Sequence, residues 1–286
     1  MSSTVDRAPV AGIRARLDAE LLATLQCLKQ SGRRFDLHET RKHLKRARAL
    51  VRLLRDAFGE TVYRKLNVAL RNSARPLSQA RDAQVLLQTL AQLTQDKQRP
   101  VLKLARLRAD LKREERQHQA AVTTRVSTVS GRIWRTRQMA QRVHAAHLGW
   151  QPIGIALRRT YRRGRRAQQK ASDDGTAEQL HEWRKQAKYS WHQMEALQPT
   201  APKAIGKKIK HLHELSDLLG DDHDLFVLQE RIAHTRAVGQ PERDRIRSLS
   251  ERQRKRLQRK AVRLGARIYS SSPKRVQRKF TRYWHT

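Results

Sequence analysis

Residues 37–45 read LHETRKHLK, and residues 180–188 read LHEWRKQAK. Six of the nine positions are identical, and the two stretches lie 143 residues apart. A second pair follows downstream in the same order, because Leu77–Leu86 aligns with Leu219–Leu228 at an offset of 142. Two motifs that recur in one order at nearly one spacing indicate two copies of a single structural unit.

Both copies of the first motif place apolar side chains on one helical face. At 100° per residue, the apolar side chains of residues 37–58 fall in one sector about 100° wide, and those of residues 180–197 do the same. Such spacing is typical of a helix that packs against a core. The two sets are Leu37, Leu44, Ala47, Val51, Leu54 and Phe58, and Leu180, Trp183, Ala187, Met194 and Leu197.

A cationic sector lies directly beside each apolar sector. In the first copy it holds His38, Arg41, Lys45, Arg48 and Arg52, and in the second it holds His181, Arg184 and Lys188. For a single helix, a solvated basic face beside a core is the simpler interpretation. Both copies, however, place the cationic stripe at the same angle from the apolar sector, and this repetition favours an anion-binding site over a solvated surface. Like charges so close together are costly until an anion lies between them.

Helical signals continue over nearly the whole chain. Apolar spacing predicts a helix from Val10 to Gly32, and Asp36 is the expected N-cap of a helix that Gly59 ends. Pro76 separates the helices expected over about 60–75 and 76–95. Further helices are expected at about 100–128, from 153 to a loop at 172–175, and at 176–198, 202–219, 223–237 and 241–270.

The repeat predicts one all-α domain over residues 8–270. Its simplest architecture is a pseudo-twofold pair of helical bundles, in which the basic stripes face each other across a central groove or cavity. Repeat one is expected over about 8–128 and repeat two over about 151–270, with a linker at about 129–150. Residues 271–286 are expected to form a basic C-terminal tail.

The charge of the chain predicts a polyanionic partner. The 286 residues include 63 Lys and Arg but only 26 Asp and Glu, which gives a net charge of +37. Such an excess points to nucleic acid, an acidic membrane surface or a free phosphate polymer. Hydrophobic residues make up 38% of the chain, which is enough for a core and excludes a disordered basic tail. Aromatic residues make up only 5%, which favours a ligand with phosphates and no bases.

Cysteine count and hydropathy exclude further classes. Cys27 is the one cysteine, so an intrachain disulfide and a multi-cysteine zinc site are ruled out, and a packed core thiol is expected. No stretch of about 18 apolar residues occurs, and we therefore expect neither a signal peptide nor a transmembrane helix.

A metal site is suggested by residues 221–224, which read DDHD and have His211 and His213 nearby. The repeat argues against it. The counterpart of His223-Asp224 is Arg81-Asp82, and arginine is not a metal ligand. What the copies share is Asp82 and Asp224, for which we expect a structural role, either pairing with a basic side chain or capping a helix.

Catalysis by His38 or His181 is conceivable because histidine titrates near neutrality. No carboxylate pair, Gly-rich phosphate loop or nucleophile motif accompanies either residue. Two simpler interpretations stay open: each histidine donates hydrogen bonds to phosphate, or it holds the start of its helix. The protein is therefore not expected to be an enzyme.

Nucleic-acid binding is the main alternative function. A chain of +37 will bind DNA or RNA at low salt through counterion release. The sequence carries no zinc-finger, basic-zipper or RNA-recognition signature. The basic stretches 158–166, 203–210 and 252–267 are either phosphate-backbone contacts or solvated surface. Membrane binding is not expected, because no helix pairs a fully basic face with exposed large aromatics.

At these motifs the chain resembles the CHAD family, the conserved histidine α-helical domain. The resemblance rests on the two His-x-x-Arg-x-x-x-Lys helices and the segments around Asp82 and Asp224, four elements in order, and it covers about residues 8–270. It implies an all-α fold of two four-helix bundles with pseudo-twofold symmetry. It also implies non-catalytic binding of inorganic polyphosphate in a basic central cavity, and cytoplasmic association with polyphosphate bodies.

The second motif departs from the family pattern. An Arg-Tyr pair usually follows it, whereas this chain has Trp191 and His192. Trp191 is the repeat partner of Arg48, and Glu195 is the partner of Arg52. The second half therefore offers a weaker cationic stripe, and we expect the first half to dominate affinity.

The candidate polyphosphate-binding residues combine the motif positions with neighbouring cations. No cofactor, metal or catalytic residue is expected, while the oligomeric state and the preferred polymer length are left open. The set is His38, Arg41, Lys42, Lys45, Arg48, Arg52, His181, Arg184, Lys185, Lys188, Lys207 and Lys210.

Overall fold

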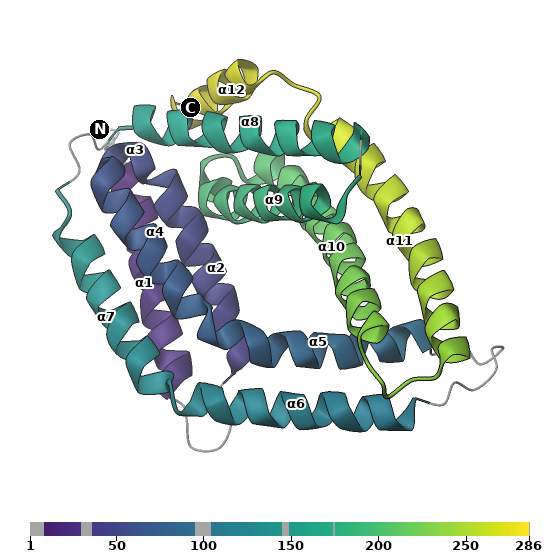
Figure 1. The fold of residues 1–286 in the computed structure, drawn as a ribbon. Coiled ribbons are helices and arrows are strands. Elements are labelled where there is room, and N and C mark those ends of the chain that lie inside the picture. The colour runs from purple at the N-terminus through teal and green to yellow at the C-terminus, as the bar shows by residue number, and fades with distance from the viewer. Residues whose placement is uncertain (1–8, 30–35, 95–103, 145–148, 174, 286) are drawn as a thin grey trace.

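The protein is built from helices (Figure 1). A computed structural model describes residues 9–29, 36–94, 104–144, 149–173 and 175–285. No strand occurs in these ranges, and the predicted all-α fold is confirmed. None of the described helices has both the length and the apolar character needed to cross a membrane.

The first half contains seven helices within the described ranges. Asp36 caps α2 as predicted, because its Oδ1 accepts a hydrogen bond from the backbone N–H of Glu39 at 3.0 Å. Gly59 ends the short α3 with a φ of +79°, a conformation that favours glycine. The helices are α1 (Pro9–Lys29), α2 (Leu37–Leu53), α3 (Arg55–Phe58), α4 (Glu60–Ala74), α5 (Pro76–Thr94), α6 (Ala105–Thr123) and α7 (Val126–Arg142).

The second half begins with a helix of 23 residues and continues through three more long ones. Thr176 and Gln179 form a reciprocal capping box at the start of α9. The elements are α8 (Gln151–Asp173), α9 (Ala177–Leu197), the 3₁₀ turn η1 (Gln198–Thr200), α10 (Pro202–Ala233), α11 (Gln240–Ile268) and α12 (Pro273–His285).

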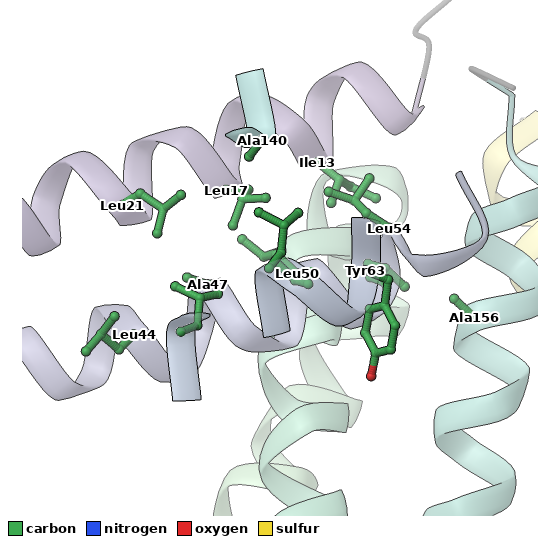
Figure 2. Packing of buried hydrophobic residues seen from close by; sticks show 14 of the residues in the cluster. Ile13, Leu17, Leu21, Leu44, Ala47, Leu50, Leu54, Tyr63, Ala140 and Ala156 are labelled. Atoms are coloured by element: carbon green, nitrogen blue, oxygen red, sulfur yellow. The ribbon is translucent and has the colours of Figure 1, made fainter. Parts of the chain in front are cut away.

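The two motif helices pack as their apolar sectors predict. Figure 2 shows Leu17 and Leu21 of α1 facing Leu44 and Ala47 of α2. Every residue of both predicted apolar sets is buried. Each motif helix lies against the helix that precedes its motif, α2 on α1 and α9 on α8. The pseudo-twofold relation between the halves stays a prediction.

The buried residues form three clusters, two of which contain residues of both halves. The largest joins α1, α2, α4 and α7 to parts of α8, α9, α10 and α12. A second lies within α8–α11 around the fully buried Trp183. The third joins α5 and α6 to α10 and α11. The boundary between the halves is therefore not a boundary between cores.

Three expected boundaries differ from the structure. Helix α7 occupies Val126–Arg142, most of the range expected as a linker, and packs on α1 and α4. Helix α10 runs without interruption through Gly220, where a break was expected, because its i→i−4 bonding continues through residues that pack on both sides. The C-terminal residues form α12, which packs on α8 through Val276 and Phe280 rather than extending as a tail. The expected helix end at Gly32 lies outside the described residues.

Candidate functional site

A cavity of about 680 Å³ lies between α2, α5, α9 and α10. Both motif helices line it, and eight of the twelve predicted residues meet there. Helix α2 contributes His38, Arg41, Lys42 and Lys45, and α9 contributes His181, Arg184, Lys185 and Lys188. The two motifs, 143 residues apart in sequence, thus contribute their basic residues to one cavity.

Direct packing of α2 on α9 brings the stripes together. In the buried contact between these helices, the side-chain amide of Gln193 donates a hydrogen bond to the carbonyl of Ala49 at 3.2 Å. Because the apolar sectors of both helices are turned into the cores, the basic residues beside them in the two nine-residue motifs are turned into the cavity.

Hydrogen bonds and ion pairs position several of the cations. Arg41 Nη1 donates to the carbonyl of Leu77 at 2.8 Å, which ties α2 to the start of α5. Lys42 pairs with Glu39 at 3.1 Å, and Lys185 makes the same i−3 pair with Glu182. The glutamates conserved between the two copies of the repeat thus orient the lysine that follows each of them.

Like charges lie close together in the cavity wall. Burial lowers the pKa of Lys188 well below its ordinary value, and the nearby charges of Arg184 and Lys45 act in the same direction. Anions in the cavity would be favoured by this field, because they would stabilise the charged form of each lysine.

Two histidines lie together in the cavity wall. His181 of α9 and His223 of α10 have ring centroids 4.8 Å apart. Burial, followed by the charge of Arg184, lowers the pKa of both residues, for His223 to about 4. Both imidazoles are therefore neutral at pH 7 and can donate one N–H each.

Carboxylates also line the cavity. They are Asp82 of α5 and Asp217, Asp221 and Asp224 of α10. Arg184 Nη2 lies 3.7 Å from Oδ1 of Asp224, so the predicted pairing of Asp224 with a basic side chain is confirmed. The same role for Asp82 stays a prediction. Burial raises the pKa of Asp221, and the charges of Asp224 and Asp217 add to the effect.

An aromatic group closes another part of the cavity. Trp191 stacks on His192 and His213, with centroid distances of 4.6 Å and 4.2 Å. His192 is buried, and its Nδ1 lies 2.9 Å from Oε2 of Glu195. At the two positions where the second motif departs from the family pattern, the side chains thus take part in a packed cluster.

His213 and His223, which the sequence suggested only as possible metal ligands, also line the cavity. A signal was present. His213, Asp217, Gly220 and Asp224 follow one another at helical spacing on α10, and all of them line the cavity. The unrecognised element was the long helix, because the chain was expected to break near Gly220.

Four predicted residues lie outside this cavity. Arg48 and Arg52 are on α2 beyond it, with guanidinium carbons 6.0 Å and 4.1 Å from the ring centroid of Tyr189. Lys207 and Lys210 are exposed on the first turns of α10 and do not line the cavity.

A second cavity of about 580 Å³ adjoins the first. The two share Val85, Asp221 and Asp224, and α11 contributes Arg252 and Arg256 to the second. Part of the basic stretch at 252–267 therefore borders a cavity that lies next to the first one. Within the described ranges, no three His, Cys, Asp or Glu side chains are placed to hold a metal ion.

Comparison with known proteins agrees with this geometry. The CHAD domain profile matches residues 15–233. The structure of PptA from Streptomyces chartreusis is similar with a TM-score of 0.68 and 13% sequence identity, over 92% of this chain and 99% of that one. This likeness concerns the fold. No curated protein sequence matches the chain. With the family profile matched over most of its length, and with both histidine motifs lining one cavity, the chain belongs to the CHAD family.

Proposed function

We propose that the protein binds inorganic polyphosphate in the cavity between α2 and α9, without catalysis. The observation that carries the proposal is the meeting of the two repeated cationic stripes in one space. A phosphate polymer carries a charge on every unit. Arginine offers it forked donors, and lysine offers point charges. Rigid helices hold these groups, so little ordering is needed on binding.

The shape of the site supports a ligand without bases. Proteins that bind single-stranded nucleic acid stack the bases on aromatic side chains. Trp191 lines the cavity, but two imidazoles already stack on its indole. The indole therefore offers a base little free surface, whereas the cations of both motif helices face the same space.

Binding rather than catalysis is supported by the sequence, which carries neither a Gly-rich phosphate loop nor a nucleophile motif. Family membership supports a role in association with cytoplasmic polyphosphate bodies.

A nucleic-acid function is the second candidate, favoured by the exposed cations of α11. Arg252, Arg256, Arg259 and Arg263 are exposed and follow one another at helical spacing. A diffuse cationic surface of this kind binds any phosphate backbone at low salt.

The deciding experiment titrates the protein with long-chain polyphosphate and with duplex DNA at several salt concentrations. Both affinities should fall steeply with salt, since both ligands release counterions. We expect polyphosphate to stay tightly bound at about 0.15 M salt, where exposed charges are largely screened, while DNA dissociates. If the two ligands weaken together, or if DNA binds more tightly, the nucleic-acid function replaces this one.

A further inference from the structure

A second cluster of cations lies beyond the cavity, where α2 meets α8 and α9. Its centre is the buried ring of Tyr189 on α9. The guanidinium of Arg52 stacks on this ring at 4.1 Å, and that of Arg48 lies 6.0 Å from the same centroid. Stacking occupies the face of a guanidinium and leaves the N–H donors at its edge for a ligand.

The carboxylates at this end of the molecule are already engaged by other arginines. Both oxygens of Asp56 accept hydrogen bonds from Arg159, each at 2.8 Å. The two oxygens of Glu60 accept from Arg55 at 2.7 Å and from Arg64 at 2.6 Å.

Arg48 and Arg52 therefore lack a counter-charge. In the described part of the chain, neither residue, nor Arg163 of α8, forms an ion pair with a carboxylate. The Nε atoms of Arg48 and Arg52 are shut off from solvent and have no hydrogen-bond acceptor. A buried donor without an acceptor is costly, and neither guanidinium group has a carboxylate partner in the described chain that would offset this cost.

The positive charges of this cluster repel one another, and burial together with this repulsion lowers the pKa values of Arg48 and Arg163. Burial lowers the pKa of Arg48, and the charges of Arg52 and Arg71 lower it further. Burial also lowers the pKa of Arg163, to which the charges of Arg52 and Arg55 contribute. Three helices thus bring guanidinium groups together without an internal anion.

We propose that Arg48 and Arg52, stacked beside Tyr189, and Arg163 next to Arg52 form a second anion site, outside the cavity, that takes a phosphoryl oxyanion. The ligand class rests on the proposed function. Planar forked donors match the oxygens of a phosphoryl group, and several such forks can hold one group from different sides. Along α2, Arg52 follows the cavity residue Lys45 by two turns, about 10 Å at 1.5 Å per residue. The site is thus within reach of a polymer that enters the cavity.

The test compares three double variants of the full chain by calorimetric titration. The cluster variant is Arg52→Gln with Arg163→Gln. Its matched control is Arg166→Gln with Lys170→Gln, which removes the same charge from exposed positions farther along α8. The cavity variant is Lys45→Gln with Lys188→Gln. The probes are tripolyphosphate and long-chain polyphosphate. Circular dichroism checks the fold of each variant, and the single change Arg163→Gln, at an exposed side chain, serves if the cluster variant does not fold.

We expect the cluster variant to lose about tenfold in affinity for long-chain polyphosphate, the effect of about one charge-assisted hydrogen bond, while the control loses about twofold or less. A parallel loss for tripolyphosphate would show that the site takes free oxyanions. A loss confined to the long polymer would show that it takes a phosphoryl group of a chain held in the cavity.

Equal affinities of the cluster variant and its control for both probes would overturn the second site. That result leaves the proposed function standing if the cavity variant loses polyphosphate. Conversely, a cavity variant with unchanged affinity refutes polyphosphate binding in the cavity, whatever the cluster variant does.

Discussion

Arg184 Nη2 lies 3.7 Å from Oδ1 of Asp224, and this ion pair joins the two segments that the sequence repeats. Arg184 belongs to the histidine motif on α9, and Asp224 to the downstream motif on α10. The pair joins α9 to α10 and places a carboxylate inside a cavity that both cationic stripes line. Asp224 therefore holds the site together and at the same time opposes the binding of an anion.

Replacing Asp224 by Asn should strengthen polyphosphate binding by about threefold to tenfold. The change removes one negative charge from the cavity wall and releases Arg184 for the ligand, at close range where charge pairs matter most. Titration at constant salt measures the effect. Asp244→Asn on the exposed part of α11 is the control, because it makes the same charge change away from the cavity. Weaker binding by the Asp224 variant would mean that positioning outweighs charge.

The double change Arg41→Glu with Lys45→Glu should abolish polyphosphate binding and leave the helix content unchanged. It reverses two charges in the first stripe, which we expect to dominate affinity. Arg41 also donates a hydrogen bond to the carbonyl of Leu77, so its replacement changes both the charge and the contact between α2 and α5. The single variant Lys45→Glu tests the effect of charge without the loss of this hydrogen bond. The matched control Arg166→Glu with Lys170→Glu should cost far less. Unchanged affinity of the double variant would refute the cavity as the site.

Arg184→Glu should weaken binding less than Lys45→Glu, because Asp224 already offsets part of the charge of Arg184. The same titration compares the two single variants. A loss for Arg184→Glu that equals or exceeds the loss for Lys45→Glu would contradict the dominance of the first half.

The free protein should lose stability as the pH falls from about 6.5 towards 4. Burial, with the charges of Arg184, His181 and Lys188, lowers the pKa of His223 to about 4, and burial also lowers the pKa of His181. An unfolded histidine titrates near 6.5. Between these pH values the unfolded state binds more protons than the folded state, so the free energy of unfolding decreases as the pH falls.

Bound polyphosphate should reverse this trend, because an anion stabilises both imidazolium groups. We expect the ligand-induced rise in Tm to be larger at pH 5 than at pH 7, and smaller in His223→Gln than in the parent chain at pH 5. The same rise at both pH values in the parent chain would show that neither histidine faces the ligand.

Gly265→Ala should destabilise the protein by about 1–3 kcal/mol, the usual cost of overpacking a filled core. A Cβ at position 265 would lie 2.9 Å from Cη2 of the fully buried Trp183 and closer still to Cζ2. The control is Gly206→Ala on α10, where a Cβ meets nothing within 4 Å. That change should stabilise the helix by about 0.5–1 kcal/mol. Urea unfolding distinguishes them, and equal midpoints would mean that Trp183 shifts to make room.

Helix periodicity and capping were readable from the sequence because they depend on neighbours within a few residues. The apolar sectors of α2 and α9 are buried as predicted, and Asp36 caps α2 where the sequence places an N-cap. The failures have one cause. Helices α7 and α12 pack on α1 and α8, respectively, whose residues lie far away in the sequence. Helix α10 continues through Gly220 because it packs on α9 and on α11.

Part of the candidate site could likewise be predicted from local sequence, and part depends on packing between distant helices. The repeated motif identified eight of the cations and histidines that line the cavity, because helical spacing places them on or next to a sector beside an apolar face. It did not show that Arg48 and Arg52 lie outside this cavity, next to the ring of Tyr189. Their position depends on where α8 and α9 pack against α2. Nor did it single out Asp222, whose buried carboxylate accepts hydrogen bonds from Arg254 and Gln258 and joins α10 to α11.

The sequence by itself determined an all-α chain, its duplicated motif and the phase of each cationic stripe relative to the core, because helical periodicity carries that information locally. Only the tertiary structure decided which cations share a space and which carboxylates oppose them. It also decided which arginines are left without a counter-charge. Those properties depend on the distance between charges, and for residues 143 positions apart this distance is set by helix packing.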